Sequence, residues 1–234
     1  RRLRIVLRHV FQEAREIRSR LPLANLPLSV SALATRRLAD LLHNSNPADA
    51  VVIIGSGPMS RAAAEYIAKW DARIVIVNRT LSKVQEQADR LGARTLTFDE
   101  FISEPVRAGS VRAIVTATSR PDAFLTKEFL EGFAQKGIVL VDMAVPPDVE
   151  SAAAQMPGVR LVNMESLRSE LLINRARREE AAREADAMIG DALFRTEAGL
   201  AAGLSGSSLR EIQENVRTKS RAHLAHLLED RLRH

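Results

Sequence analysis

Short apolar runs alternate with amphipathic stretches through the middle of this 234-residue chain. Residues 51–54 (VVII) are wholly apolar and β-branched, a pattern that predicts a strand buried on both faces of a parallel sheet. Further strands are expected at 74–77, 93–97, 113–118, 138–142 and 159–162, and helices between them at 61–69, 81–91, 99–103 and 126–134. This alternation predicts an α/β fold with a doubly wound, mostly parallel Rossmann-type sheet.

The pattern changes at both ends of the chain. Residues 5–21 and 30–42 predict two amphipathic helices, and the segment between them contains two prolines. From 165 to about 204 there is no proline, and an apolar stripe at helical spacing predicts one long helix; it includes Ala185, Met188, Ile189 and Ala192. A last helix is expected at 208–228. The expected divisions are N-terminal helices at 1–43, a dinucleotide-binding domain at 44–163 and a helical dimerisation domain at 164–234.

The C-terminal helices have no sheet of their own to cover. A long apolar stripe of this kind is usually buried against a second copy of the chain, so the pattern favours a homodimer held by these helices. The alternative is that the helices fold back on the sheet of the same chain.

A glycine turn follows the first strand directly. In the sequence GSGPMS, Gly55 permits a tight bend, and the absence of a side chain at Gly57 lets the backbone approach a pyrophosphate. Pro58 fits the first position of the helix that follows, whose free N–H groups face an anion. Ser60 is small enough for helix and strand to pack closely. With a strand before it and a helix and second strand after it, this turn predicts a dinucleotide site.

The end of the second strand indicates which dinucleotide binds. An NAD site places an acid there to hold the ribose 2′-hydroxyl, whereas this chain has Asn78, Arg79 and Thr80. Arg79 can pair with a 2′-phosphate through its fork of donors. We therefore expect NADPH as the cofactor.

Composition narrows the remaining chemistry. The chain has 46% apolar residues and no cysteine, which excludes disulfides, thiolate metal sites and a cysteine nucleophile on this stretch. No apolar run is long enough to span a bilayer, and no hydrophobic secretory core is present, so a cytoplasmic protein is expected. His223 and His226 stand at a spacing that could ligate a metal, but no carboxylate completes the set, and no metal site is expected.

The net charge of +5 is concentrated at the N-terminus. The first twenty residues contain seven arginines and two glutamates, while the rest of the chain balances. This segment could meet RNA phosphates, but the pattern favours a solvated helix face, and no aromatic residues are interleaved for base stacking.

Several stretches together resemble the glutamyl-tRNA reductase family, which reduces glutamyl-tRNA to glutamate-1-semialdehyde for tetrapyrrole synthesis. The matching segments are the turn at 55–60, NRT at 78–80, ATS at 117–119, DMAVPPD at 142–148, the helix at 174–189 and the helix at 208–228. The resemblance extends upstream to 15–18 and 29–31, so it covers about residues 9 to 228. It implies an NADPH-dependent oxidoreductase that is homodimeric, with glutamyl-tRNA or a substrate-carrying protein as partner.

The chain also departs from that family. The family's N-terminal catalytic domain carries a cysteine that takes the glutamyl group as a thioester, and this sequence has no cysteine. Pro147 stands where the family has arginine, and Ser60 stands where it has the last glycine of the turn. Two explanations are open: a fragment of a full reductase, or a natural relative without the acyl-transfer half.

The positions expected to bind the cofactor are Gly55, Ser56, Gly57, Pro58, Met59, Ser60, Asn78, Arg79, Thr80, Thr116, Ala117, Thr118 and Met143. No acid–base pair stands out, so catalytic residues are not assigned. By analogy Asp142 and Asp148 flank the nicotinamide, but capping of loops is an equally good explanation for them. Two functions remain in view: a reductase whose substrate is held elsewhere, and a non-catalytic NADPH-binding dimer that regulates or binds another protein.

Overall fold

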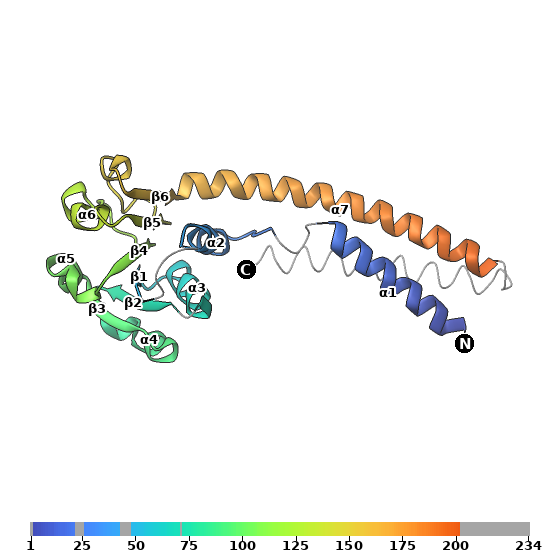
Figure 1. Ribbon diagram of the computed structural model, residues 1–234, viewed down its shortest axis with the longest axis horizontal. Coiled ribbons are helices and arrows are strands. Elements are labelled where there is room, and N and C mark those ends of the chain that lie inside the picture. Colours follow the sequence, from blue (N-terminus) through green and yellow to red (C-terminus); the bar gives the residue numbers. More distant parts are fainter. Residues whose placement is uncertain (1, 22–25, 43–47, 71, 202–234) are drawn as a thin grey trace. The chain divides into compact units, whose positions relative to one another are not determined.

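The computed structural model describes residues 2–21, 26–42, 48–70 and 72–201, and side chains between 10 and 194 within these ranges. The described residues form two compact units (Figure 1). One unit comprises Ser29–Leu171, and the other combines the segment before residue 29 with the segment from Leu172 onward. Each unit is described by itself below.

The first unit contains a six-stranded parallel sheet. Its strands are β1 (Ala50–Ile54), β2 (Arg73–Asn78), β3 (Arg94–Thr97), β4 (Val111–Thr116), β5 (Ile138–Asp142) and β6 (Val159–Asn163). The order across the sheet is β3-β2-β1-β4-β5-β6, and all five pairings are parallel. The predicted doubly wound Rossmann-type sheet is therefore confirmed. The strand order reverses between β1 and β4, where α/β folds place their ligands.

Helices cover both faces of this sheet (Figure 1). On one face, α2 (Val30–Leu42), α3 (Pro58–Ile67) and α4 (Gln85–Leu91) pack against alternate strand residues such as Val51 and Ile53. On the other face, α5 (Phe98–Ser103) and α6 (Lys127–Ala134) pack against residues such as Val52 and Ile54. All five residues of β1 are buried, as the unbroken apolar run predicts.

Helix α2 belongs to the sheet unit, although the sequence suggested a division at residue 43. Leu33, Ala34 and Leu38 of α2 lie in the same buried cluster as Val51. Ser29 begins the helix, and its Oγ accepts a hydrogen bond from the Ala32 N–H at 3.2 Å. The amphipathic pattern of α2 showed that one face would be buried, but not which neighbour would bury it.

The second unit is built from α1 (Arg2–Arg20) and most of the long helix α7 (Met164–Ala201). Leu21 packs with Ala181 and Ala185 of α7, and Met188 lies beside them. The buried Asn174 donates from Nδ2 to the Pro27 carbonyl at 3.2 Å. The predicted long helix is thus present as far as the structure describes it.

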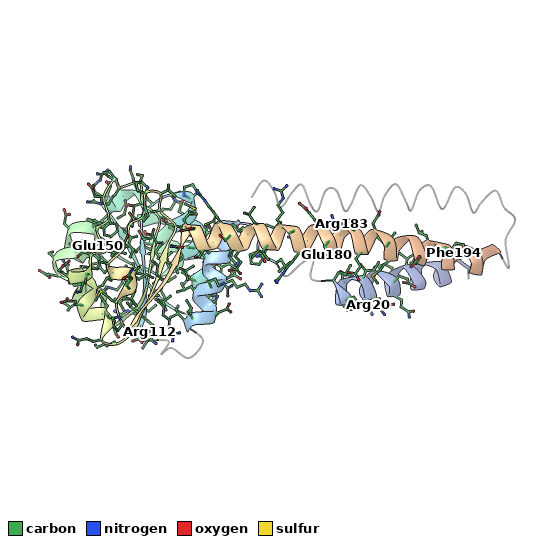
Figure 2. All side chains as sticks on the ribbon, turned by 90° about the horizontal axis from the view of Figure 1, so that it is seen from above. Arg20, Arg112, Glu150, Glu180, Arg183 and Phe194 are labelled. Atoms are coloured by element: carbon green, nitrogen blue, oxygen red, sulfur yellow. The ribbon has the colours of Figure 1, made fainter. Side chains whose placement is uncertain are left out.

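Other side chains of α7, among them Glu180, Arg183 and Phe194, are labelled in Figure 2. The expected helix at 208–228, with its two histidines, lies outside the described residues. Within the described residues, no helix combines the length and apolar character needed to cross a membrane.

Candidate functional site

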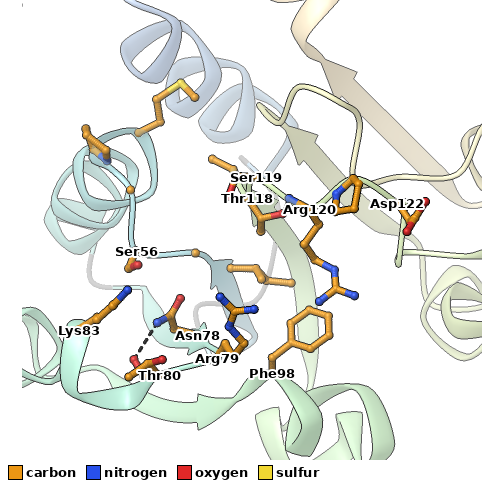
Figure 3. Close-up of a pocket in the computed structure, with 17 residues that line it drawn as sticks. Ser56, Asn78, Arg79, Thr80, Lys83, Phe98, Thr118, Ser119, Arg120 and Asp122 are labelled. Atoms are coloured by element: carbon orange, nitrogen blue, oxygen red, sulfur yellow. Dashed lines mark hydrogen bonds between the residues drawn. The ribbon is translucent and has the colours of Figure 1, made fainter.

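A cavity of about 880 Å³ opens at the carboxyl ends of the strands, where the strand order reverses (Figure 3). Ten predicted positions line it: Gly55, Ser56, Gly57, Pro58, Met59, Asn78, Arg79, Thr80, Ala117 and Thr118. The structure does not bring Ser60, Thr116 or Met143 to its wall, and these three are buried. A cavity of this size suits a ligand larger than a single sugar or amino acid.

The two glycines of the turn occupy their positions for different structural reasons. Gly55 has φ +113°, and a Cβ there would lie 2.9 Å from both the Ala117 carbonyl oxygen and Ser60 Oγ. Gly57 has an ordinary φ of −73°, and a Cβ there would meet nothing within 4 Å. The backbone therefore requires glycine at 55. At 57 the open space is what a phosphate group could occupy, directly before the first turn of α3.

The side chains of Ser60 and Arg61 form hydrogen bonds that stabilise the glycine turn. Ser60 is buried, and its Oγ donates to the Ile54 carbonyl at 3.4 Å. Arg61 donates from Nε to the Ser56 carbonyl at 3.0 Å and from a terminal nitrogen to the Lys83 carbonyl at 3.4 Å. These bonds connect the glycine turn to the segment after β2, so both walls of the cavity share one support.

The end of β2 brings cations to the cavity. Asn78 donates from Nδ2 to the Thr80 carbonyl at 2.7 Å, which shapes the turn that presents Arg79 (Figure 3). Arg79 is exposed, and Lys83 lines the same cavity from the 3-10 turn Leu81–Lys83. Chain segment 78–80 carries no acid. The electrostatic environment here favours an anionic group.

Beyond the end of β4, polar side chains bind one another. The Oγ1 atoms of Thr116 and Thr118 both donate to the Asp148 carboxylate, the second at 2.6 Å. The Thr118 N–H donates to the same carboxylate at 3.1 Å. Strand β4 ends at Thr116, two residues before the predicted end. The Thr116 and Thr118 hydroxyls are therefore occupied within the protein.

The Asp142 carboxylate also accepts hydrogen bonds from within the protein. Its two oxygens accept hydrogen bonds from the N–H groups of Ala144 at 2.9 Å, Asp148 at 2.9 Å and Val149 at 3.0 Å. Burial raises the pKa of Asp142, against the opposing effect of these backbone donors. Both carboxylates thus organise the loop from 142 to 149, which is the loop-capping alternative left open by the sequence. Met143 is buried beside them, and its N–H donates to the Thr116 carbonyl at 2.8 Å.

Several residues that line the cavity escaped the sequence analysis: Ile54, Lys83, Phe98, Ser119, Arg120, Pro121 and Asp122. Arg120 and Asp122 lie two and four residues after Thr118, so an extension of that motif by a few residues would have found them. Phe98 carried no such signal, because it follows a different strand. No group of three potential metal ligands occurs among the described residues.

The sequence of this chain is similar to one protein family model and to several known proteins. A family model described as Shikimate / quinate 5-dehydrogenase matches residues 37–170. The glutamyl-tRNA reductase of Trichlorobacter lovleyi is 28% identical over 193 residues, which are 80% of this chain and 44% of that protein. The glutamyl-tRNA reductase of Methanothermobacter marburgensis is 32% identical over 157 residues, which are 65% of this chain and 38% of that protein. The chain thus spans less than half the length of these curated relatives.

Among solved structures, the glutamyl-tRNA reductase from Methanopyrus kandleri matches 98% of this chain and 60% of its own chain. The TM-score is 0.58 and the sequence identity 22%, so the likeness concerns the fold. Together with the sequence relatives, it confirms the predicted resemblance to glutamyl-tRNA reductases.

Proposed function

Because this chain belongs to the shikimate / quinate 5-dehydrogenase family, we propose that its cavity binds a nicotinamide dinucleotide, specifically NADP(H). The observation that carries this proposal is the pairing of a glycine turn open to the cavity with Arg79 at the end of β2, where no acid stands. The turn provides N–H groups for the pyrophosphate, and Arg79 provides donors for the 2′-phosphate. The empty space beside Gly57 fits this group, since a side chain there would fill it.

The proposed reaction is that of a glutamyl-tRNA reductase, because the sequence relatives have that name. When bound, the nicotinamide would supply the hydride. The residues of this chain would bind and orient the dinucleotide: the turn at its pyrophosphate, Arg79 at its adenosine end, and the segments 117–118 after β4 and 142–149 after β5 at the other end. Asp142 and Asp148 would act through the shape of these loops, because their oxygens already accept bonds from the protein.

The acyl group must be presented by residues outside this stretch. The sequence contains no cysteine, so no thioester of the proposed kind forms on it. We therefore expect no semialdehyde from this chain with glutamyl-tRNA and NADPH, and formation of semialdehyde would contradict this part of the proposal. A second candidate function is a non-catalytic NADPH-binding module. Restoration of reduction by an added cysteine-containing partner would distinguish the two.

The first experiment measures which dinucleotide the chain binds more tightly. Calorimetric titration should show that NADPH binds more tightly than NADH. Arg79→Ala should lower NADPH affinity about ten- to a hundred-fold and leave NADH affinity unchanged, because charge-assisted bonds to phosphate are lost. Arg90→Ala is the matched control, since Arg90 pairs with Glu65 on the surface and does not line the cavity. A preference for NADH in the unaltered chain would refute the proposal.

We also propose that the chain is a homodimer through its C-terminal helices. Leu172, Ile173 and Phe194 of α7 are exposed, with Phe194 at 72%. Apolar side chains of this size favour burial against a partner by about 1.5–3 kcal/mol each. Sedimentation should report a dimer, and Phe194→Glu should weaken it. A monomer at micromolar concentration would refute the proposal.

Glutamyl-tRNA is a candidate partner. Competition between unlabelled glutamyl-tRNA and a labelled tRNA for the NADPH-loaded protein would test it.

A further inference from the structure

Arg120 lies in the loop after β4 and lines the cavity (Figure 3). Its guanidinium carbon stands 4.6 Å from the centre of the Phe98 ring and 5.6 Å from that of Phe124. The two rings meet edge to face with centroids 4.9 Å apart. Arg120 is therefore held in an aromatic notch, although its side chain is exposed to solvent.

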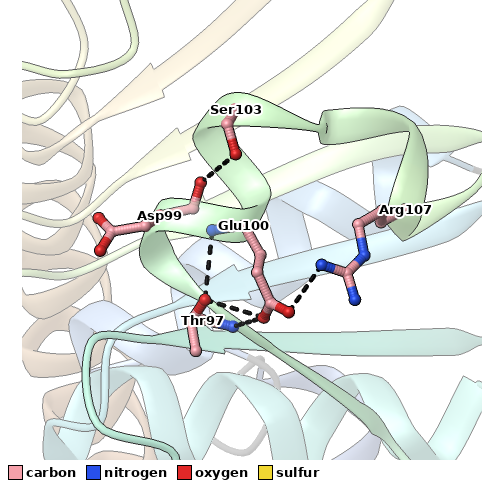
Figure 4. Close-up of polar contacts among 5 residues, drawn as sticks. All are labelled: Thr97, Asp99, Glu100, Ser103 and Arg107. Carbon is pink, nitrogen blue, oxygen red and sulfur yellow. Dashed lines mark hydrogen bonds and ion pairs between the residues drawn. The ribbon is translucent and has the colours of Figure 1, made fainter.

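Phe98 reaches this place from the other side of the cavity. It is the first residue of α5 and directly follows β3, which is separated from β4 by β2 and β1. Its position is fixed by a capping box at the start of α5 (Figure 4). Thr97 Oγ1 accepts from the Glu100 N–H at 3.2 Å, and a Glu100 oxygen accepts from the Thr97 N–H at 2.8 Å. Arg107 then pairs with Glu100 at 2.6 Å. Arg120, from the loop after β4, thus contacts a residue that follows β3 at the far edge of the sheet.

Stacking occupies a face of the Arg120 guanidinium but leaves its in-plane N–H donors. Among the described residues, Arg120, Arg79 and Lys83 form no salt bridge, whereas Arg37, Arg90, Arg107 and Arg175 do. Asp122 is the acid among the residues that line the cavity. The cavity therefore has three cations and one carboxylate at its wall, which suits a ligand with more than one negative group.

We propose that Arg120 is a second specificity-determining residue, which binds the 2′-phosphate of NADP(H) together with Arg79. Phe98 is the positioning residue that holds the guanidinium plane so that its donors point into the cavity. This inference rests on the proposed function and assigns part of the 2′-phosphate affinity to a residue outside the segment that follows β2. The fork of an arginine matches phosphate geometry, which gives the assignment its chemical reason.

The test uses the full chain and two ligands that differ by one phosphate, adenosine 2′,5′-bisphosphate and adenosine 5′-monophosphate. Arg120→Ala should weaken binding of the bisphosphate about ten- to a hundred-fold and leave the monophosphate unchanged. Arg120→Lys should lose part of the affinity, since it keeps the charge without the fork. Arg90→Ala is again the control and should change neither affinity. Thermal unfolding of each variant should match the unaltered chain, because Arg120 is exposed.

A double-mutant cycle separates positioning from general structure. Phe98→Leu should weaken bisphosphate binding in the presence of Arg120, and it should have little effect once Arg120 is alanine. This coupling is the result expected if Phe98 acts through Arg120. Equal effects of Phe98→Leu in both backgrounds would overturn the positioning role.

The outcomes distinguish this inference from the function on which it rests. If the unaltered chain discriminates between the two ligands through Arg79 but Arg120→Ala changes nothing, the assignment of Arg120 is wrong and the cofactor proposal stands. Equal losses for both ligands would show that Arg120 contacts the base or the 5′-phosphate, and this also overturns the assignment. No binding of either ligand by the unaltered chain would overturn both.

Discussion

After β2, Arg79 and Lys83 line the cavity without a salt bridge in the described part of the chain. After β5, by contrast, Asp142 accepts hydrogen bonds from its own loop, and Asp148 accepts them from Thr116 and Thr118 at the end of β4. The cations on the first side are exposed to solvent, so they can pair with an anionic ligand. The second side is buried, and its polar atoms are satisfied internally. We infer that the first side provides recognition and the second provides support, because an unpaired charge is tolerated only where water reaches it.

Gly55 is the point where the two sides meet, and its substitution has the largest expected effect. In Gly55→Ala the new Cβ would stand 2.9 Å from the Ala117 carbonyl oxygen in a backbone conformation with φ +113°. We expect a loss of about 4 kcal/mol in the free energy of unfolding, measured by urea denaturation. Gly57→Ala is the control. It should change that free energy by less than about 1 kcal/mol while it weakens NADPH binding. Similar stability losses at both glycines would contradict the difference drawn between them.

Asp148→Ala tests the supporting side. The change leaves the Thr116 and Thr118 hydroxyls and the Thr118 N–H without their acceptor, so we expect about 3 kcal/mol of destabilisation. The ratio of NADPH to NADH affinity should stay the same, because Arg79 lies on the other side and the Arg120 side chain is held by Phe98 and Phe124 rather than by Asp148. Asp148→Asn keeps an acceptor oxygen and should lose less. An altered cofactor ratio in either variant would show that the two sides are not separate in function.

Thr97→Ala tests the wall of the recognition side. It removes the oxygen that accepts the Glu100 N–H at the start of α5, and the expected loss is about 1 kcal/mol in unfolding free energy. Thr97→Ser retains this oxygen and should be close to the unaltered chain. A null effect of the alanine variant would mean that other contacts hold Phe98 in place.

The smallest expected effect is a difference in pH dependence between the two sides. Hydrogen bonds from Thr97, followed by the Arg107 contact, hold the pKa of Glu100 below its ordinary value of 4.5. Its stabilising contribution is therefore present above pH 4.5 and is lost as the pH falls through the lowered pKa. The stability difference between the unaltered chain and Glu100→Gln should shrink in that window when urea denaturation is repeated down to acid pH.

Asp142 should show the opposite sign. Burial raises its pKa above the ordinary 3.8, so its contribution is fully present below that pH and is lost as the pH rises through the raised pKa. Comparison of the unaltered chain with Asp142→Asn over the same pH series would measure this. Parallel pH profiles for the Glu100 and Asp142 variants would contradict the assignment of the two groups to different surroundings.

The recognition side could be predicted largely from sequence because its parts are consecutive. Gly55, Gly57 and Pro58 lie within four residues, and Arg79 follows the next strand, so local spacing was enough. The contact between Arg120 and Phe98 depends on the strand order and on the path of a loop, and no local pattern encodes either of them.

On the supporting side, sequence spacing was less informative. Thr116 and Met143 were expected at the cofactor because their segments resemble a family motif; both side chains are buried and do not line the cavity, and their contact with a cofactor stays a prediction. Residue type alone cannot tell whether a hydroxyl faces a ligand or a neighbouring carboxylate. The neighbour of α2 was open for a similar reason, since amphipathicity shows that one face is buried but does not identify what buries it.

The strand order has a consequence for solubility. It leaves β3 and β6 as the edge strands of the sheet in the described part of the chain, and edge strands carry backbone groups that can pair with another extended chain. Strand β3 is only four residues long and begins with the exposed Arg94. Strand β6 carries the exposed Arg160 as its second residue. Short length at one edge and charge at both oppose edge-to-edge aggregation, and neither arginine lines the cavity.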